Sequence, residues 1–353
     1  MENIRIGERE IGVGAPCFLA AEIGLNHNGN LELAMETVIA AAEAGADAVK
    51  FQNFRTEDFL FDRSLTYTYK SQGKEITESQ WDMFKRCEPL PEWWPEIKAL
   101  CDKLGIVFFS TPTAELGVDE MVKVGAPLLK NGSDYLSHTP LLQYMGSSGI
   151  PVIVSTGMAN QQDVDEAVAA VQRAKNSPLM LLHCTSAYPT LIENTNLRRM
   201  VTMQDRYDVP IGYSDHTKGY QAAAQAVALG ASMIEKHFTL DHNLPGPDQW
   251  FSTMPEEFAQ LVKEVRDAET RLGRAEIVPS AAESETRIEF RLSAVAVRDL
   301  SAGTELRSTD TVFRRPGEGL PPAEIGNYLG RRLSRNVAKG TPLQSQDFAS
   351  DAT

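Results

Sequence analysis

The sequence predicts an α/β protein: a (β/α)8 barrel of the TIM type, followed by a small C-terminal domain. Its 353 residues exceed the size of one ordinary hydrophobic core, which favours one large domain and one small one. Eight short apolar segments with polar ends recur through residues 1–279, with amphipathic helical segments between them. Beyond Leu272 this rhythm is lost and turn residues dominate.

The eight expected strands are mostly continuous apolar runs, as is usual where helices cover a parallel sheet. In chain order they are CFLAAEIG (17–24), AVKFQ (48–52), IVFFSTP (106–112), PLLKNGS (127–133), PVIVSTG (151–157), LMLLHCTS (179–186), VPIGYSD (209–215) and SMIEKHF (232–238). Five glycines stand where a helix needs a left-handed residue before the next strand, namely Gly45, Gly105, Gly125, Gly149 and Gly230. An open doubly wound sheet is the alternative, but no GxGxxG motif follows the first strand.

We expect three segments: a barrel domain over residues 1–279, a linker over 280–290 and a small, loop-rich domain over 291–353. In the small domain, the RRPGEGL loop places Arg314 and Arg315 on a Pro-Gly turn, where solvated arginines are as common as functional ones. Within the barrel, the long loop from Asp58 to Pro89 suits a substrate lid or a subunit contact equally.

The composition argues against several partners. A formal net charge of -14 disfavours nucleic acids and anionic membranes, because both would be repelled at long range. No stretch approaches the roughly 18 apolar residues of a membrane span, and the amino terminus lacks the apolar run of a signal peptide. The four cysteines show neither CxxC spacing nor the density of a disulfide scaffold. We therefore expect a cytoplasmic protein, in which nothing near Cys184 activates its thiol.

Polar residues end all eight expected strands, on the barrel face where catalytic groups gather. Two of them, Lys50 and Lys130, emerge from apolar strands, where an unpaired charge is costly. For one lysine a structural carboxylate is as good a partner as a substrate, but two lysines among many hydroxyls favour a substrate with phosphate and carboxylate groups. The strand-end residues are Glu22, Lys50, Gln52, Ser110, Thr111, Lys130, Ser133, Ser155, Thr156, Thr185, Ser186, Ser214, His216, Glu235 and His237.

Two histidines, His216 and His237, end two consecutive strands that a helical segment separates, so these strands should be parallel and adjacent. An acid stands close to each histidine, Asp215 and Glu235. A lone histidine is more often a core residue, but two neutral imidazoles at equivalent strand ends predict a divalent metal site.

A dozen motifs carry a resemblance that covers essentially the whole chain: AEIGLNHNG, AVKFQ, FFSTP, KNGS, STGM, LLHCTSAYPT, IGYSDHT, IEKHFTLD, LPGPD, AVAVRDLSAG, RRPGEG and GRRLSRNVAKGTPL. In them the chain resembles the sialic acid synthases with a C-terminal antifreeze-like (SAF, β-clip) domain. The resemblance implies condensation of phosphoenolpyruvate with an open-chain 2-acetamido sugar aldehyde, giving a nine-carbon 3-deoxy-2-keto acid and phosphate. It also implies a divalent metal, with manganese favoured over magnesium or cobalt, and a domain-swapped homodimer whose small domain closes the partner's barrel.

The resemblance further assigns roles to residues. His216 and His237 would hold the metal, Glu22 would bind sugar hydroxyls, and Glu235 and Asp248 would support metal, water and proton transfers. Arg315 from the partner chain would reach the acylamino end of the sugar. The other substrate-binding residues would be Lys50, Gln52, Thr111, Lys130, Ser133, Ser155, Ser186, Tyr188 and Ser214.

Two stretches depart from the family pattern and leave the acceptor open. KNGSDY replaces a more usual KIGSGE, and GPDQWFS stands where many members have GPDHKAS, so that Trp250 could narrow the sugar end of the pocket. The candidate acceptors are N-acetylmannosamine, its 6-deoxy diacetamido relative and an altro sugar. Alternatives from other classes are a metal-dependent barrel aldolase or isomerase that does not use phosphoenolpyruvate, and a noncatalytic carbohydrate- or ice-binding protein.

Overall fold

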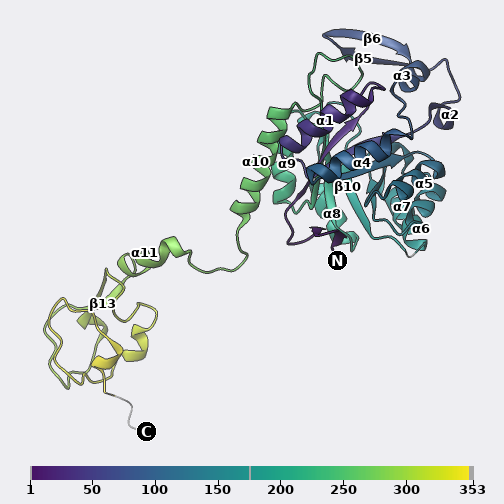
Figure 1. Cartoon of the computed structure of the whole chain (residues 1–353). Coiled ribbons are helices and arrows are strands. Elements are labelled where there is room, and N and C mark those ends of the chain that lie inside the picture. The colour runs from purple at the N-terminus through teal and green to yellow at the C-terminus, as the bar shows by residue number, and fades with distance from the viewer. Residues whose placement is uncertain (1, 175, 350–353) are drawn as a thin grey trace. The chain divides into compact units, whose positions relative to one another are not determined.

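The computed structural model of the chain describes residues 2–174 and 176–349. The chain divides into two compact units, Met1–Gly273 and Arg274–Thr353, which are visible in Figure 1. This division comes shortly before the boundary expected at residue 279. Within the described ranges, no helix combines the length and the apolar character that crossing a membrane requires.

The first unit is built around a closed barrel of parallel strands, as the sequence predicts. Successive strands are neighbours, and the last pairs with the first to close the barrel. The strands are β3 (Phe18–Gly24), β4 (Ala48–Asn53), β7 (Val107–Pro112), β8 (Leu129–Asn131), β9 (Val152–Ser155), β10 (Leu179–Cys184), β11 (Ile211–Asp215) and β12 (Met233–His237). The register sets His237 beside Glu22 and Glu22 beside Lys50, so the predicted functional residues lie level around the carboxyl ends.

Helices follow the strands and surround the barrel (Figure 1). Their ends follow the local sequence: the Asn30 side chain accepts a hydrogen bond from the Leu33 N–H at the start of the first, and Gly105 ends another with φ 73°. The helices that cover the barrel are α1 (Leu31–Glu43), α4 (Trp93–Leu104), α5 (Glu115–Val124), α6 (Thr139–Ser147), α7 (Gln161–Arg173), α8 (Arg198–Arg206), α9 (Gln221–Ala228) and α10 (Pro255–Leu272).

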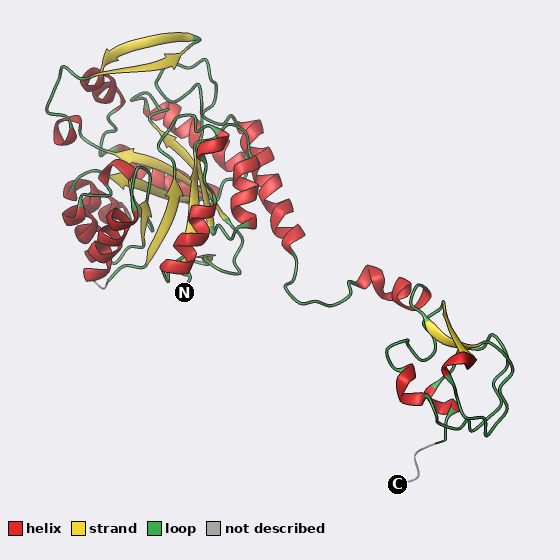
Figure 2. Ribbon diagram, turned by 180° about the vertical axis from the view of Figure 1, so that it is seen from behind, coloured by secondary structure: helices red, strands yellow, loops and turns green. Residues whose placement is uncertain are grey.

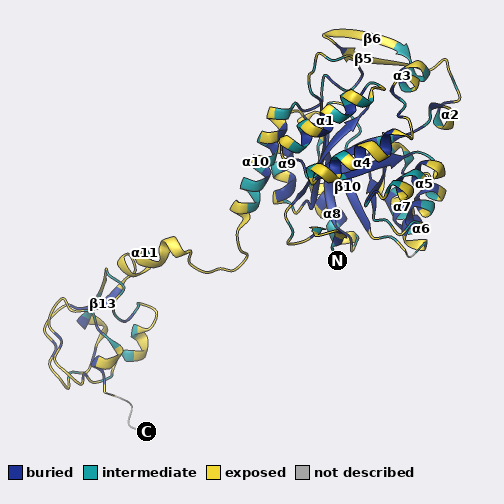
Figure 3. Cartoon of the chain, viewed as in Figure 1, coloured by how far each residue is buried: buried dark blue, intermediate teal, exposed yellow. Residues whose placement is uncertain are grey.

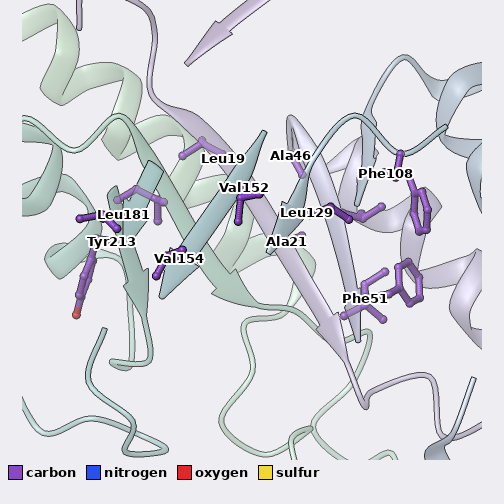
Figure 4. Packing of buried hydrophobic residues seen from close by; sticks show 14 of the residues in the cluster. Leu19, Ala21, Ala46, Phe51, Phe108, Leu129, Val152, Val154, Leu181 and Tyr213 are labelled. Atoms are coloured by element: carbon purple, nitrogen blue, oxygen red, sulfur yellow. The ribbon is translucent and has the colours of Figure 1, made fainter. Parts of the chain in front are cut away.

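The hydrophobic core has two layers. The outer and larger layer fills the space between strands and helices, where Phe51 and Phe108 lie beside each other with ring centres 6.1 Å apart (Figure 4). The inner layer fills the barrel near its amino end, which the hairpin of β1 (Ile4–Ile6) and β2 (Arg9–Ile11) covers with isoleucines. The barrel strands are accordingly buried along their length (Figure 3). Packed side chains close the amino end of the barrel, which leaves its carboxyl end for a site.

The long loop between β4 and β7 carries structure of its own. It contains α2 (Thr56–Phe59), α3 (Gln80–Cys87) and an antiparallel hairpin of β5 (Thr66–Ser71) and β6 (Lys74–Ser79), drawn as a separate ribbon in Figure 2. The hairpin contacts the loop after β12: Gln72 donates to the Asn243 carbonyl (3.0 Å), and the Gly246 N–H donates to Ser71 (3.2 Å).

The second unit has a small core of its own. An antiparallel pair, β13 (Ser293–Ala296) and β14 (Thr311–Arg314), packs with surrounding turns around a cluster that includes Leu300, Leu333 and Phe348. Before it, the expected linker contains α11 (Ser284–Glu289), whose residues are mostly exposed. Residues 274–279 are all exposed and have neither helix nor strand.

Candidate active site

A cavity of about 390 Å³ lies at the carboxyl ends of the barrel strands. The structure brings nearly all the predicted barrel residues to it: the lining includes Glu22, Lys50, Gln52, Thr111, Lys130, Ser133, Ser155, Ser186, Tyr188, Ser214, His216, Glu235 and His237. Asp248 is not among the lining residues, but its Oδ2 lies 3.8 Å from Nδ1 of His237. Arg315 belongs to the second unit, where its guanidinium lies 4.9 Å from the centre of the Phe290 ring, and its predicted role stays a prediction.

The two buried lysines are each paired with a carboxylate. Nζ of Lys50 lies 2.7 Å from Oε2 of Glu22 and donates to Thr111 (3.1 Å), while Nζ of Lys130 lies 3.3 Å from Oε1 of Glu235. Burial alone would lower the pKa of Lys50, but the charges of Glu22 and Glu235 outweigh it and the pKa is raised. Each lysine ammonium has three N–H donors, so both lysines keep an N–H group for an anion.

Beside the lysines, hydroxyls and a backbone amide form what we call the anion cradle: Ser133, Gly157 and Ser186. The Gly157 N–H donates to Oγ of Ser133 (3.0 Å), which lies 2.9 Å from Oγ of Ser155. Oγ of Ser186 is buried and has no hydrogen-bond partner among the described residues. A Cβ on Gly157 would lie 2.2 Å from Oγ of Ser186, so only glycine leaves this space free. The unsatisfied Ser186 hydroxyl, in one cavity with two ammonium groups, suits a phosphate or carboxylate.

The two predicted metal-binding histidines lie next to each other in the cavity lining, with ring centres 5.4 Å apart. Nδ1 of His216 lies 2.9 Å from the Thr185 carbonyl, which can only accept, so Nδ1 carries a proton, while Nε2 lies 3.5 Å from the Ser214 hydroxyl. Nδ1 of His237 is buried and lacks a hydrogen-bond partner in the described part of the chain. The unsatisfied Nδ1 of His237 and the weakly engaged Nε2 of His216 fit a divalent cation. No group of three or more His, Cys, Asp or Glu in that part is arranged to bind a metal, so the two histidines are the candidate ligands.

The charges act differently on the two histidines. Burial, and then the neighbouring His216 and Lys50, lower the pKa of His237 well below its ordinary value and keep that imidazole neutral. Burial alone would also lower the pKa of His216, but its contacts with Cys184 and the Thr185 carbonyl outweigh it and the pKa is raised. Burial, and to a smaller extent Glu22, raises the pKa of Asp248 to about 7. For Glu235 burial acts in the raising direction, but Lys130 and Lys50 outweigh it and the pKa is lowered. The cavity thus holds neutral and charged groups side by side.

The expectation about Cys184 was wrong. Its Sγ lies 3.9 Å from Nδ1 of His216 and lines the cavity. Burial alone would raise the pKa of the thiol, but His216, and then Ser133 and Lys130, lower it to about 6. The sequence could not show this, because Cys184 and His216 lie on different strands and their approach depends on the barrel register.

Aromatic residues complete the cavity, and most of them were missed from the sequence. Tyr188 packs on His216 (4.2 Å between ring centres) and on Phe251 (5.4 Å), and Phe251 packs on His237 (5.2 Å). Trp250, expected to narrow the mouth, instead lies between the ammonium groups of Lys70 (5.2 Å) and Lys218 (5.8 Å) and is not among the described lining residues.

Three phenylalanines form a further part of the lining, which we call the aromatic wall: Phe54, Phe59 and Phe84. Their rings meet edge to face, with centres 5.0 to 5.7 Å apart. Phe59 belongs to α2 and Phe84 to α3, so the long loop supplies most of the wall. No motif marked these residues, because Phe59 and Phe84 are ordinary apolar positions of short helices and Phe54 lies just after the end of β4.

Comparisons with known proteins agree with this geometry. A family model described as the NeuB family matches residues 37–277, and a SAF domain model matches residues 291–349. The N,N'-diacetyllegionaminic acid synthase of Legionella pneumophila is 41% identical over 96% of both chains. The N-acetylneuraminate-9-phosphate synthase of Mus musculus is 34% identical over 97% of this chain and 95% of its own. A crystal structure of an N-acetylneuraminic acid synthetase from Leptospira borgpetersenii in complex with citrate, 35% identical, covers 81% of this chain and 95% of its own with a TM-score of 0.74.

Proposed function

Because this chain belongs to the NeuB family, we propose that it condenses phosphoenolpyruvate with the open-chain aldehyde of an acylamino sugar. The products are a nine-carbon 3-deoxy-2-keto acid and phosphate. The observation that carries the proposal is one cavity in which two buried lysines and an anion cradle lie beside two neighbouring histidines. The names of its relatives, synthases of legionaminic and neuraminic acids, support the same reaction class.

Phosphoenolpyruvate binds at the floor of the cavity. Lys50 and Lys130 offer their remaining N–H groups to its phosphate and carboxylate, and Ser186 and the Gly157 amide lie beside them. The two lysine charges are already balanced by Glu22 and Glu235, so these four side chains give no net positive charge to a multiply charged anion. A divalent cation at the histidines would supply that charge.

His216 and His237 would hold this cation, with manganese the favoured ion. When bound there, it supplies Lewis-acid polarisation of the aldehyde oxygen. Glu22, together with Gln52, which donates to it (2.9 Å), orients the sugar by its hydroxyls. The methylene carbon of phosphoenolpyruvate then bonds to the aldehyde carbon, water adds at C2 and phosphate leaves.

Two carboxylates are placed to move protons in this sequence. Asp248, whose Oδ2 lies 3.8 Å from Nδ1 of His237, would supply the proton that the new hydroxyl needs. Glu235 is held by Lys130 and by the Ser214 hydroxyl (3.2 Å) and can accept the proton of the added water. Tyr188 covers His216 and keeps bulk water from this part of the cavity.

The acceptor we propose is a 6-deoxy diacetamido hexose. Lys50, Gln52 and Phe54 are alternate residues running out of β4, so Phe54 lies beyond the level at which Gln52 meets the sugar. The aromatic wall there can take a methyl group, whereas a terminal hydroxyl would lose its water without gaining a partner. The Legionella pneumophila relative carries the name of a diacetyllegionaminic acid synthase, which supports the same choice.

The metal and its ligands give the direct test of this function. His216→Ala and His237→Ala should each lower turnover by about 100-fold or more without unfolding the barrel, because strand-end ligands add little to the core. Since two protein ligands bind weakly, a chelator should abolish phosphate release and added manganese should restore it. Full activity in metal-free buffer would contradict the proposal.

A further inference from the structure

Two buried charges stand directly beside the histidines but do not reach the cavity. Asp215 at the end of β11 and Lys236 in β12 are register partners, and neither is among the described residues that line the cavity. Their side chains are 0% and 4% exposed. The residues on either side of them do line it: Ser214, His216, Glu235 and His237.

The pair shares several hydrogen bonds with one loop residue, and Asp215 also interacts with the Tyr213 hydroxyl. Nζ of Lys236 lies 2.7 Å from Oδ2 of Asp215 and donates to the Thr217 carbonyl, also at 2.7 Å. Oδ1 of Asp215 accepts from the Thr217 N–H (2.9 Å) and from its hydroxyl (2.7 Å). Asp215 and Thr217, the two neighbours of His216 in the sequence, are therefore both bonded to Lys236, the residue before His237.

Stability does not account for this arrangement. The other outward positions of these two strands, Ile211, Tyr213 and Ile234, belong to the apolar core between strands and helices. Apolar residues of similar size commonly replace a buried ion pair with no loss of stability, because desolvation of the two charges offsets their attraction. A charged pair at this position in place of an apolar one points to a requirement for defined geometry.

We propose that Asp215 and Lys236 are positioning residues that fix the separation of the His216 and His237 rings. The inference rests on the proposed function, because it takes the two histidines as the metal ligands. Because only two protein side chains would bind the metal ion, the distance and angle between these ligands depend on how rigidly the ends of β11 and β12 are held. Groups that orient metal ligands typically change affinity by about 10 to 100-fold when altered.

The test measures manganese binding to the full chain without substrates, by the electron paramagnetic resonance signal of free Mn²⁺. The main variant is Asp215→Asn with Lys236→Met, which leaves no charge unpaired and keeps an oxygen for the Thr217 N–H. We expect its Kd to rise about 10 to 100-fold while the melting temperature of the barrel is unchanged. A Kd within twofold of the wild-type value would overturn the proposal.

A matched control removes an ion pair of the same signs elsewhere. Asp165 and Arg206 are bonded on the surface helices α7 and α8, and Asp165→Asn with Arg206→Met should leave the manganese Kd unchanged. A second variant, Thr217→Val, removes one hydrogen bond from Asp215 but keeps the charge pair, so it decides the question if the main variant does not fold. We expect Thr217→Val to weaken binding several-fold, and unchanged binding would overturn the proposal.

The outcomes separate this inference from the proposed function. A wild-type chain that binds manganese, with variants that bind it equally well, would contradict the positioning role alone. A wild-type chain that binds no manganese would contradict the proposed metal site and this inference with it.

Discussion

His27 and His237 are both buried, but their surroundings give them different roles. The ring of His27 packs against Phe51 and Trp93, with centres 6.0 and 5.3 Å away, and its Nδ1 accepts from the Gly29 N–H (3.1 Å). Each ring has one buried nitrogen without a hydrogen-bond partner among the described residues, Nε2 of His27 and Nδ1 of His237, but only His237 lines the cavity. From the sequence, His27 in the loop after the first strand could equally reach the mouth of the barrel or be a turn residue, and the structure makes it a packed turn residue.

The pH dependence of folding should report His27. Burial lowers its pKa from 6.5 to about 4, so between these values the unfolded chain binds a proton that the folded chain does not. The free energy of unfolding should therefore fall as the pH falls from 6.5 towards 4, by up to about 3 kcal/mol, and this contribution is complete above pH 6.5.

The measurement is urea unfolding of the wild-type chain and of His27→Asn, which keeps an acceptor for the Gly29 N–H, at pH 7.5 and pH 4.5. The wild type should be the more stable at pH 7.5, and its advantage should shrink by about 2 kcal/mol or more at pH 4.5. An advantage that does not change with pH would show that His27 takes up its proton equally in both states.

At the scale of elements, the sequence predicted the barrel strands and their inward-facing residues, because both follow from the strand period. It missed the aromatic residues that the loops bring to the site. Apolar runs ending in polar residues locate all eight barrel strands, and alternation along β4 places Lys50 and Gln52 on the inner face. For each lysine, the sequence left open whether its partner is a carboxylate of the protein or an anionic substrate. The structure shows a carboxylate beside each one, which the sequence could not predict because cross-strand pairing depends on register. Phe251 and the aromatic wall lie outside the strands, where no period marks them.

The aromatic wall should decide which acceptor is used. We expect the wild-type kcat/KM to be about 10 to 100-fold higher with a 6-deoxy diacetamido hexose than with N-acetylmannosamine, because the wall accepts a methyl group and gives a hydroxyl no partner. Phe59→Ser should remove most of this preference by lowering activity with the 6-deoxy sugar, and should leave the KM for phosphoenolpyruvate unchanged.

Phe61→Ser is the matched control, since Phe61 is close in sequence but its side chain is 98% exposed. It should keep the wild-type preference. Equal kcat/KM for the two sugars in the wild type, or an equal loss for both in Phe59→Ser, would exclude the wall as the determinant of the acceptor.

At the scale of the whole molecule, the chain joins a barrel that carries a cavity to a small unit that carries Arg315. Residues 274–279, at the start of the second unit, are exposed and without helix or strand. The exchange of small domains in a homodimer, which the sequence resemblance implies, stays a prediction.

Mixed dimers test that exchange. Glu22→Gln and Arg315→Ala homodimers should each be poorly active. If Arg315 of one chain serves the barrel of the other, refolding equal amounts together gives mixed dimers with one doubly altered site and one intact site. Random pairing then restores up to about a quarter of the wild-type sites. No recovery in dimers shown to be mixed would assign Arg315 to its own chain or to no site.

The central claim, condensation with phosphoenolpyruvate, is tested most directly by following the bridging oxygen of that substrate. The chain is incubated with manganese, each of the three candidate sugars and phosphoenolpyruvate labelled with ¹⁸O between C2 and phosphorus, and products are read by mass spectrometry. Because water adds at C2 before phosphate leaves, we predict labelled phosphate, formed only when a sugar is present, together with an unlabelled nine-carbon keto acid. No phosphate with any of the three sugars, or phosphate that lacks the label, would contradict the account.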